Sequence, residues 1–241
     1  MKEKTCGKAS TILHGKKKVN PKRVLLINSD PFELATLSAS LRLHGVNVVG
    51  EASNIFLAEN LHRSLQPEVV LAELQSPGEE AIGFINKARK INPKLGIVIM
   101  TVFPDLRLIG LQEKNIPHGS KIILKRTLSD LSILTTTVAA SLATDTDSLR
   151  VTWIDNHAAI HENSSFNKVR QLTDVQIETL RLLAQGLSNS EIARVRFVSE
   201  KSVEQIVARI AKHFLISPDR TRNLRVILAG EYFKWLGASL I

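Results

Sequence analysis

The chain has 241 residues, of which 44% are hydrophobic and 23% charged, and a formal net charge of +9 at pH 7. This length is enough for two ordinary domains. No apolar run approaches a membrane span or a signal-peptide core, and the single cysteine, Cys6, excludes an internal disulfide framework. We therefore expect a cytoplasmic protein without a membrane anchor.

The positive charge is concentrated at the two ends of the chain. Residues 1–23 carry a net charge of +7 and residues 171–241 a net charge of +3, so the middle is close to neutral. Residues 1–21 show no sustained apolar period, and we predict that they form a disordered basic tail. Such a tail either adds non-specific attraction for phosphates or is a solvated end without a role, and we prefer the second reading.

From Arg23 onward, short apolar runs alternate with helix-like segments. The runs lie at 23–28, 46–52, 69–74, 96–101 and 121–125, and the segments between and after them end near His44 or span about 54–65, 79–91, 105–113 and 128–142. Runs rich in Val, Ile and Leu are typical of parallel strands covered on both faces. Residues 22–142 are thus predicted to form a doubly wound α/β domain with a five-stranded parallel sheet. Binding sites of such sheets form beyond the carboxyl ends of the strands.

Residues at those strand ends point to a known family. Asn28 and Ser29 follow the first run, Glu73 lies at the end of the third, Thr101 ends the fourth and Lys125 ends the fifth. The stretch LAELQSPG (71–78) also keeps the shape of a strand-three loop. In these features the segment resembles the receiver domain of bacterial two-component response regulators. The resemblance implies a phosphoacceptor site at these five positions, where typical receivers carry an acidic pair, a phosphorylated aspartate, a Ser/Thr and a lysine.

The chemistry of that site is predicted to be degenerate. Receivers need Mg²⁺, which carboxylates usually hold, but Asn28 and Ser29 have none and Asp30 is displaced by one position. Glu73 carries its carboxylate one methylene further out than aspartate, and a misplacement on the order of 1 Å can cost about 100-fold in rate. We predict a pseudo-receiver that is not phosphorylated. Glu73 either contacts Lys125 and Thr101 and mimics an activated state or, in the simpler reading that we prefer, is a polar residue at a decayed site.

Residues 143–168 are polar and rich in Asp, Asn and Ser, which predicts a linker with a short ordered piece near 151–154. His157 and His161 have a spacing that can hold a metal on a helix, but only Glu162 is at hand as a third ligand. We predict a surface pair there and no metal site.

Residues 172–214 contain three amphipathic segments with very short connections. Two capping-box pairs, Thr173 with Gln176 and Ser188 with Glu191, begin the first two helices. Gly186 ends the first helix, the second spans about 189–194, and Ser199 caps the third after a turn at 196–198. One face of the third helix is apolar, formed by Val203, Ile206, Val207, Ile210 and Phe214.

The opposite face of the third helix carries Lys201, Ser202, Glu204, Gln205, Ala208, Arg209 and Lys212. This layout fits a helix-turn-helix, although a plain helical bundle shares the spacing. The string LT…LRLLAQGLSNSEIA…FxSxxSV closely resembles the LuxR-type helix-turn-helix of bacterial transcription regulators, over about residues 169–236. The resemblance implies a four-helix DNA-binding domain whose last helix, about 223–235, often serves as a dimer contact.

The sequence departs from that family's pattern at several positions. Family members often carry a basic residue where Glu204 stands, a histidine in place of Ile206, and an Arg-Glu pair in place of Val175 and Gln176. Glu204 matters most, because a carboxylate accepts a hydrogen bond from cytosine but repels phosphates.

These features predict a transcription regulator that binds double-stranded DNA as a homodimer and is not controlled by aspartyl phosphorylation. The outer face of the third helix would contact the DNA, and Lys201, Lys212 and the arginines at 220, 222 and 225 would hold phosphates. The pseudo-receiver would then supply dimerisation or bind a protein partner. The alternative is an adaptor or anti-regulator that Glu204 keeps from DNA. An enzyme is least expected, because no nucleophile triad, phosphate loop or metal cluster stands out, and we expect no cofactor.

Overall fold

A parallel sheet forms the first half of the computed structural model, which describes residues 22–75, 78–128, 130–142, 150–154, 168–217 and 221–236. Its strands are β1 (Arg23–Ile27), β2 (Asn47–Ala52), β3 (Val69–Leu74), β4 (Gly96–Thr101), β5 (Lys121–Leu124) and β6 (Thr152–Ile154). They pair in the order β2-β1-β3-β4-β5-β6, and each pair is parallel. The crossovers are helical, as parallel pairing requires.

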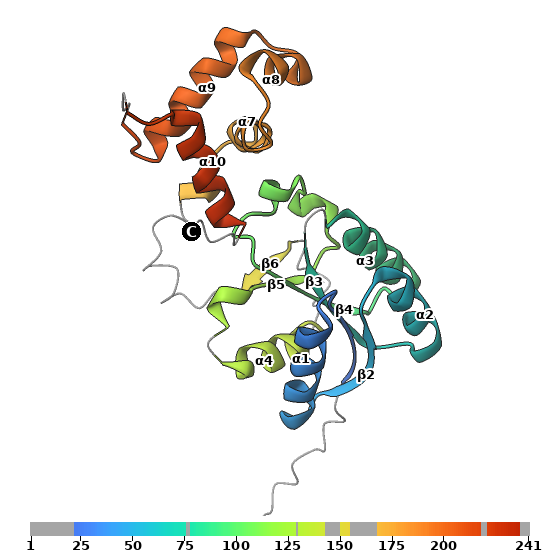
Figure 1. Cartoon of the computed structure of the whole chain (residues 1–241). Coiled ribbons are helices and arrows are strands. Elements are labelled where there is room, and N and C mark those ends of the chain that lie inside the picture. Colours follow the sequence, from blue (N-terminus) through green and yellow to red (C-terminus); the bar gives the residue numbers. More distant parts are fainter. Residues whose placement is uncertain are drawn as a thin grey trace, which may run out of the picture.

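Helices cover both faces of the sheet (Figure 1). They are α1 (Pro31–Leu43), α2 (Ile55–Leu65), α3 (Glu79–Ile91) and α4 (Leu131–Ala140), joined by the short 3₁₀ turns η1 (Leu106–Ile109), η2 (Glu113–Asn115) and η3 (Lys125–Thr127). Successive residues of a strand point to opposite faces. Leu25 and Ile27 of β1 accordingly join the core under α2 and α3, whereas Val24 and Leu26 join the core under α1 and α4. The predicted doubly wound architecture is confirmed.

The sheet has six strands where five are predicted from the sequence. The additional strand, β6, lies inside the stretch predicted to be a linker and pairs with β5 through the register Lys121↔Thr152 to Ile123↔Ile154. A Thr-Trp-Ile segment has high strand propensity, but three residues at an edge are too few to give a periodic signal. The Trp153 indole also donates to the Glu113 carboxylate at 2.6 Å, which fixes the strand to η2.

The predicted helix at 105–113 is wrong. The short 3₁₀ turn η1 forms there instead and ends at Gly110, which has a φ of 80°, and η2 begins only at Glu113. The apolar residues of this segment serve two cores rather than one: Leu106 and Ile109 pack into the sheet domain, while Leu108 is buried among the C-terminal helices. An amphipathic helix buries its apolar side chains on one face. This segment buries them in two directions, so a regular helix would not bury both sets.

The second half of the chain is helical and consists of α7 (Asp174–Ala184), α8 (Asn189–Arg196), α9 (Glu200–His213) and α10 (Leu224–Trp235). Thr173 and Gln176 form the predicted capping box, and Ser199 caps α9 as predicted. At α8 only half of the predicted box forms. The Ser188 hydroxyl accepts from the Glu191 amide, but the Glu191 carboxylate pairs with Arg194 at 2.8 Å. A guanidinium one turn away competes successfully with the backbone amide.

The two halves meet at η1. Arg107 donates to the Asp174 carboxylate at 2.7 Å and to the carbonyl oxygens of Leu172 and Arg170 at 3.0 and 3.3 Å. Asp105 holds the same guanidinium from the other side at 2.6 Å. The Asp105 hydrogen bonds are the main reason why the pKa of Arg107 is raised, although burial opposes them. The charge of Arg107 is therefore fixed between the two domains.

α10 supplies the second part of this contact. The buried Tyr232 hydroxyl donates to the Leu108 carbonyl at 2.6 Å, and Arg126 donates to the Lys234 carbonyl at 3.3 Å. Burial raises the pKa of Tyr232, so the phenol remains a donor. Near β6, the Arg170 guanidinium lies 4.7 Å from the centre of the Trp153 ring. The helical domain therefore contacts the receiver-like domain through α7, α10 and the residues that precede α7.

Some predictions fall on residues outside the described part of the chain. They concern the tail at 1–21, the pair His157 and His161, and Arg220. Within the described ranges, no helix is both long and apolar enough to cross a membrane. No group of three or more His, Cys, Asp or Glu side chains there is placed to hold a metal ion.

Candidate functional site

The five predicted phosphoacceptor positions gather at the carboxyl ends of β1, β3, β4 and β5. Glu73 is the centre of the cluster, and its side chain is only 6% exposed. One of its carboxylate oxygens lies 2.6 Å from Lys125 Nζ, and the other accepts from the Gln75 amide at 3.2 Å. Glu73 is therefore a buried residue with both carboxylate oxygens engaged.

Lys125 lies between two carboxylates. Besides Glu73, its ammonium group contacts Glu33 in the first turn of α1. Burial lowers the pKa of Lys125, but hydrogen bonds and charge from Glu33 and Glu73 outweigh burial, so the pKa is raised above its ordinary value. The cluster therefore holds one fixed cation between two anions.

Asn28 and Thr101 do not join that cluster through hydrogen bonds. The Asn28 side-chain oxygen accepts from the Asp30 amide at 2.8 Å, and its buried amide nitrogen has no partner among the described residues. The buried Thr101 hydroxyl contacts the Leu74 carbonyl at 3.5 Å and accepts from the Phe103 amide at 3.2 Å. The predicted contact of Glu73 with Lys125 forms, whereas its contact with Thr101 does not.

Ser29 and Asp30 take roles in the local structure. The Ser29 hydroxyl donates to the Gln75 side-chain oxygen at 2.7 Å, so Gln75 links it to Glu73. Asp30 caps α1 by accepting from the Glu33 amide at 2.9 Å. The Asp30 carboxylate is therefore engaged at the start of α1.

Sequence reasoning missed Glu33 and Gln75. Glu33 lies one helical turn after Asp30, and a glutamate at that place is also expected from the helix dipole alone. Gln75 lies two residues after Glu73, on the same side of the extended chain. The two-residue repeat of an extended chain could therefore have predicted that Gln75 lies beside Glu73. The position of Glu33 next to Lys125 is visible only in the fold.

The outer face of α9 is open to solvent. Lys201, Glu204, Gln205, Ala208, Arg209 and Lys212 are exposed, and Ser202 is half-buried and contacts Ser199 at the cap. Among the described residues, no hydrogen bond or ion pair engages the charged groups of this face. Three cations and one carboxylate leave it with a charge of about +2 at neutral pH. The opposite stripe is buried as predicted, with Val203, Val207 and Ile210 in the core.

The domain contact leaves this face free. The receiver-like domain touches α7 and α10 through η1, whereas α8 and α9 lie on the far side of the helical domain (Figure 1). The surface that could enter a groove is therefore accessible while the two domains are docked.

The flanking arginines have different surroundings. Arg225 donates to the Asn189 side chain and the Leu187 carbonyl, and so fixes the loop between α7 and α8. Arg196, at the end of α8, is held by Glu178 at 3.3 Å and by the Thr179 hydroxyl at 2.7 Å. The predicted phosphate-binding role thus competes with a structural role at Arg225.

The turn between α8 and α9 exposes an aromatic side chain. Phe197 is 95% exposed and has a φ of 54°, in the left-handed region. Its amide closes the end of α8 on the Arg194 carbonyl at 3.4 Å. This geometry sets the angle at which α9 leaves α8.

Comparison with known proteins finds similar sequences for both halves of the chain. Residues 170–217 match the family described as bacterial regulatory proteins, luxR family. The chain is 27% identical over 195 residues to the nitrate/nitrite response regulator protein NarL of Escherichia coli strain K12, covering 80% of this chain and 88% of NarL. It is also 27% identical over 180 residues to the uncharacterized transcriptional regulatory protein YhcZ of Bacillus subtilis, covering 73% of this chain and 81% of YhcZ.

A solved structure agrees on the fold. The response regulator RcsB, in a complex with DNA, aligns with a TM-score of 0.53 at 20% identity and covers 90% of this chain and 99% of that structure. The match spans both domains, and their order along the chain is the same. Residues 170–217 thus match the LuxR-type helix-turn-helix, and the whole chain is similar to response regulators of the LuxR/NarL type, in which a receiver domain precedes that helix-turn-helix.

Proposed function

We propose that the chain binds double-stranded DNA through the outer face of α9 and regulates transcription without aspartyl phosphorylation. The main observation behind this proposal is that the outer face of α9 is exposed to solvent. On it, the side chains of Lys201, Gln205 and Arg209 have no hydrogen-bond or ion-pair partner among the described residues. A recognition helix needs unengaged donors and cations on its outer side. The solved RcsB complex with DNA supports this use of the fold.

Early outward residues of a recognition helix reach bases, and flanking cations hold phosphates. Ser202, Glu204, Gln205 and Ala208 are accordingly the proposed groove-facing set. Lys201, Arg209 and Lys212 are the proposed phosphate contacts. Glu204 restricts which bases the helix can contact. Its carboxylate accepts a hydrogen bond from the cytosine amino group and repels the phosphates of the DNA backbone.

The independence from phosphorylation rests on the cluster around Glu73. Both of its oxygens are engaged, and the neighbouring carboxylate of Glu33 is paired with the same lysine. An incoming phosphoryl donor would have to displace this network and find a metal held by Asn28 and Ser29, which carry no carboxylate. We propose that dimerisation or a protein partner at the receiver-like domain controls activity, and that the chain binds paired half-sites as a homodimer. The solved structure of two RcsB dimers bound to two parallel DNAs supports the dimer.

DNA capture tests the proposal. Genome-wide recovery of DNA bound to the tagged native chain is expected to give discrete paired sites. On one such site, affinity should fall about 10³-fold or more between 50 and 200 mM salt, since several phosphate contacts release counterions. In the proposed homodimer each substitution removes two phosphate contacts, so Arg209→Ala and Lys212→Ala should each reduce the salt slope by about 1.8. Lys90→Ala, on an exposed cation of α3, is the matched control and should leave the slope unchanged.

Two results would contradict DNA binding. One is the absence of enriched sites for the native chain, and the other is a salt slope that Arg209→Ala and Lys212→Ala do not change. Broad binding gained by Glu204→Lys alone would favour the alternative function, an adaptor or anti-regulator whose groove face has been turned away from DNA.

Phosphorylation has its own test. After incubation with acetyl phosphate and Mg²⁺, the intact mass of the native chain is expected to be unchanged. A stable phosphoryl adduct within residues 22–142 would refute the pseudo-receiver proposal and leave the DNA-binding proposal intact.

A further inference from the structure

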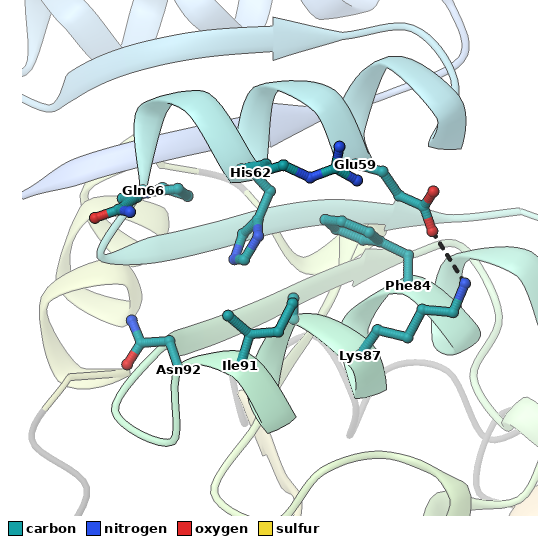
Figure 2. A pocket seen from close by; sticks show the side chains of 10 residues that line it. Glu59, His62, Gln66, Phe84, Lys87, Ile91 and Asn92 are labelled. Atoms are coloured by element: carbon teal, nitrogen blue, oxygen red, sulfur yellow. Dashed lines mark hydrogen bonds and ion pairs between the residues drawn. The ribbon is translucent and has the colours of Figure 1, made fainter.

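A pocket of about 500 Å³ lies between α2 and α3, on the face of the receiver-like domain (Figure 2). It is separate from the cluster around Glu73, because its lining residues come from the later turns of both helices and the loops that follow them. Its volume falls within the range of about 300–1,000 Å³ that is typical of small-molecule sites.

The interior of the pocket is apolar. Phe84 and Ala88 of α3 form buried parts of the lining, Pro67 adds a ring from the loop after α2, and Ile91 is 75% exposed at the edge. Figure 2 shows Phe84 and Ile91 pointing from α3 toward α2. An aromatic or branched aliphatic group of a ligand would be desolvated against these side chains.

His62 is the polar group inside this lining. Its residue is only 7% exposed, and its ring meets Phe84 edge-on, with 5.9 Å between ring centres. Figure 2 shows the imidazole pointing from α2 into the space between the helices. Among the described residues, neither ring nitrogen has a hydrogen-bond partner. The ring nitrogens are not fully enclosed by protein atoms, so they are accessible to a hydrogen-bond partner that enters the pocket.

Burial lowers the pKa of His62, so the imidazole is neutral at pH 7. A neutral imidazole donates from one nitrogen and accepts at the other. Its N–H is therefore available to an acceptor in the pocket.

The charges around the pocket favour an anion. Lys87 and Glu59 pair with each other at 3.1 Å and neutralise each other at one end. Arg63, which also lines the pocket, has no ion pair or hydrogen bond among the residues described. One positive charge is thus left over, and a guanidinium forms its strongest hydrogen bonds with carboxylates and phosphates.

We propose that this pocket binds a small monocarboxylate with an aromatic or branched aliphatic body. The carboxylate pairs with Arg63 and accepts from the His62 ring, and the apolar body lies between Phe84 and Ile91. A monocarboxylate fits better than a phosphate ester, because one surplus cation matches one negative charge and most of the lining is apolar. The site gives the receiver-like domain a chemical input that does not involve the strand-end cluster.

The test uses the full chain and defined probes. Benzoate, phenylacetate and 3-methylbutanoate are titrated into the ¹⁵N-labelled protein, alongside benzamide and phenylacetamide as uncharged counterparts. Saturable shifts are expected for amides of α2 and α3, with dissociation constants on the order of 0.1–10 mM for compounds of this size. The amides should bind about 10-fold more weakly, because they lose the charge-assisted contact.

Variants separate the site from non-specific binding. Arg63→Gln should weaken binding of the acids about 10-fold, and His62→Leu should weaken it while preserving the apolar volume. Lys90→Gln removes an α3 charge outside the pocket and should bind as the native chain does. The proposal is overturned if no probe gives saturable shifts, if acids and amides bind equally, or if Arg63→Gln binds like the native chain. None of these outcomes bears on DNA binding, which is measured without the probes.

Discussion

Single residues decide what the strand-end cluster can do. Glu73 has the charge of a phosphoacceptor, but Lys125 and Gln75 occupy both of its oxygens. These two contacts hold the carboxylate in place, which supports the proposal that Glu73 does not accept a phosphoryl group. The shared lysine also ties α1 to β3, so the cluster stabilises the fold at the edge where receivers carry out their chemistry.

Glu73→Gln should lower the free energy of unfolding by about 2 kcal/mol, because it removes one of the two anions around a largely buried lysine. Denaturant unfolding of the native and variant chains measures the difference. Glu204→Gln, on the exposed and unpaired carboxylate of α9, is the control and should stay within about 0.5 kcal/mol of the native chain. Equal stabilities for Glu73→Gln and the native chain would show that the pair contributes nothing.

His62 should make stability depend on pH. Its folded-state pKa is lowered, so its neutral form is favoured by folding. The contribution is fully present above the unfolded pKa of about 6.5 and is lost as the pH falls through the lowered folded value. Glu59, Arg63 and Lys87 are the other charged groups that line the same pocket. The free energy of unfolding, measured from pH 8 to about pH 5, should therefore fall more steeply for the native chain than for His62→Leu. Parallel curves would contradict this assignment.

At the scale of elements, the turn between α8 and α9 stores strain. A non-glycine residue in the left-handed region costs about 1 kcal/mol, and Phe197 recovers little of that cost because it is 95% exposed. The exposed phenyl ring lies in the turn that leads into α9, the proposed DNA-contacting helix.

Phe197→Gly should raise the free energy of unfolding by up to about 1 kcal/mol, because glycine takes this conformation without strain. Val195→Gly provides the contrast, since it places glycine inside α8 at another exposed apolar position and should lower stability by about 1 kcal/mol. Thermal unfolding of both variants measures whether each substitution raises or lowers the stability. A loss of stability in Phe197→Gly would mean that the phenyl ring makes a contact worth more than the strain.

The helices and strands also show which parts of the fold can be predicted from the sequence. Long periodic segments such as α9 and buried runs such as β3 were predicted correctly, because their side-chain periods report one face of a core. The segment around Leu108 was not, because its apolar residues belong to two cores and follow neither period. The strand-end positions followed from the order of the strands, but the pairing of Lys125 with Glu33 depends on how α1 packs, and no local pattern reports it.

At the scale of the whole molecule, the domain contact combines the buried Leu108 with a set of hydrogen bonds. Arg107 gathers an aspartate and two carbonyl oxygens of the helical domain, and Tyr232 donates to the backbone of η1. Contacts of this kind hold two domains in a defined arrangement but can be broken without unfolding either one. Docking and release are therefore available as two states of the same chain.

Arg107→Ala should loosen the two domains and increase the radius of gyration measured by small-angle X-ray scattering, because the interdomain hydrogen bonds are lost together. Arg42→Ala is the matched control. It breaks the Arg42–Glu51 pair of 2.8 Å within the receiver-like domain and should leave the radius unchanged. An unchanged radius for Arg107→Ala would show that Tyr232 and the apolar contacts suffice for docking.

The short edge strand β6 also sets how far a released helical domain can travel. Sheet pairing ends at Ile154 and the helical domain is described from residue 168, so the intervening chain reaches at most about 50 Å. If the sheet ended with β5, the tether would start after residue 142 and would reach about 90 Å. Half-sites for helix-turn-helix dimers lie about 34–36 Å apart or at multiples of that distance. In the proposed homodimer each protomer carries one such tether, so β6 lowers the largest separation that the two tethers allow from about 180 Å to about 100 Å.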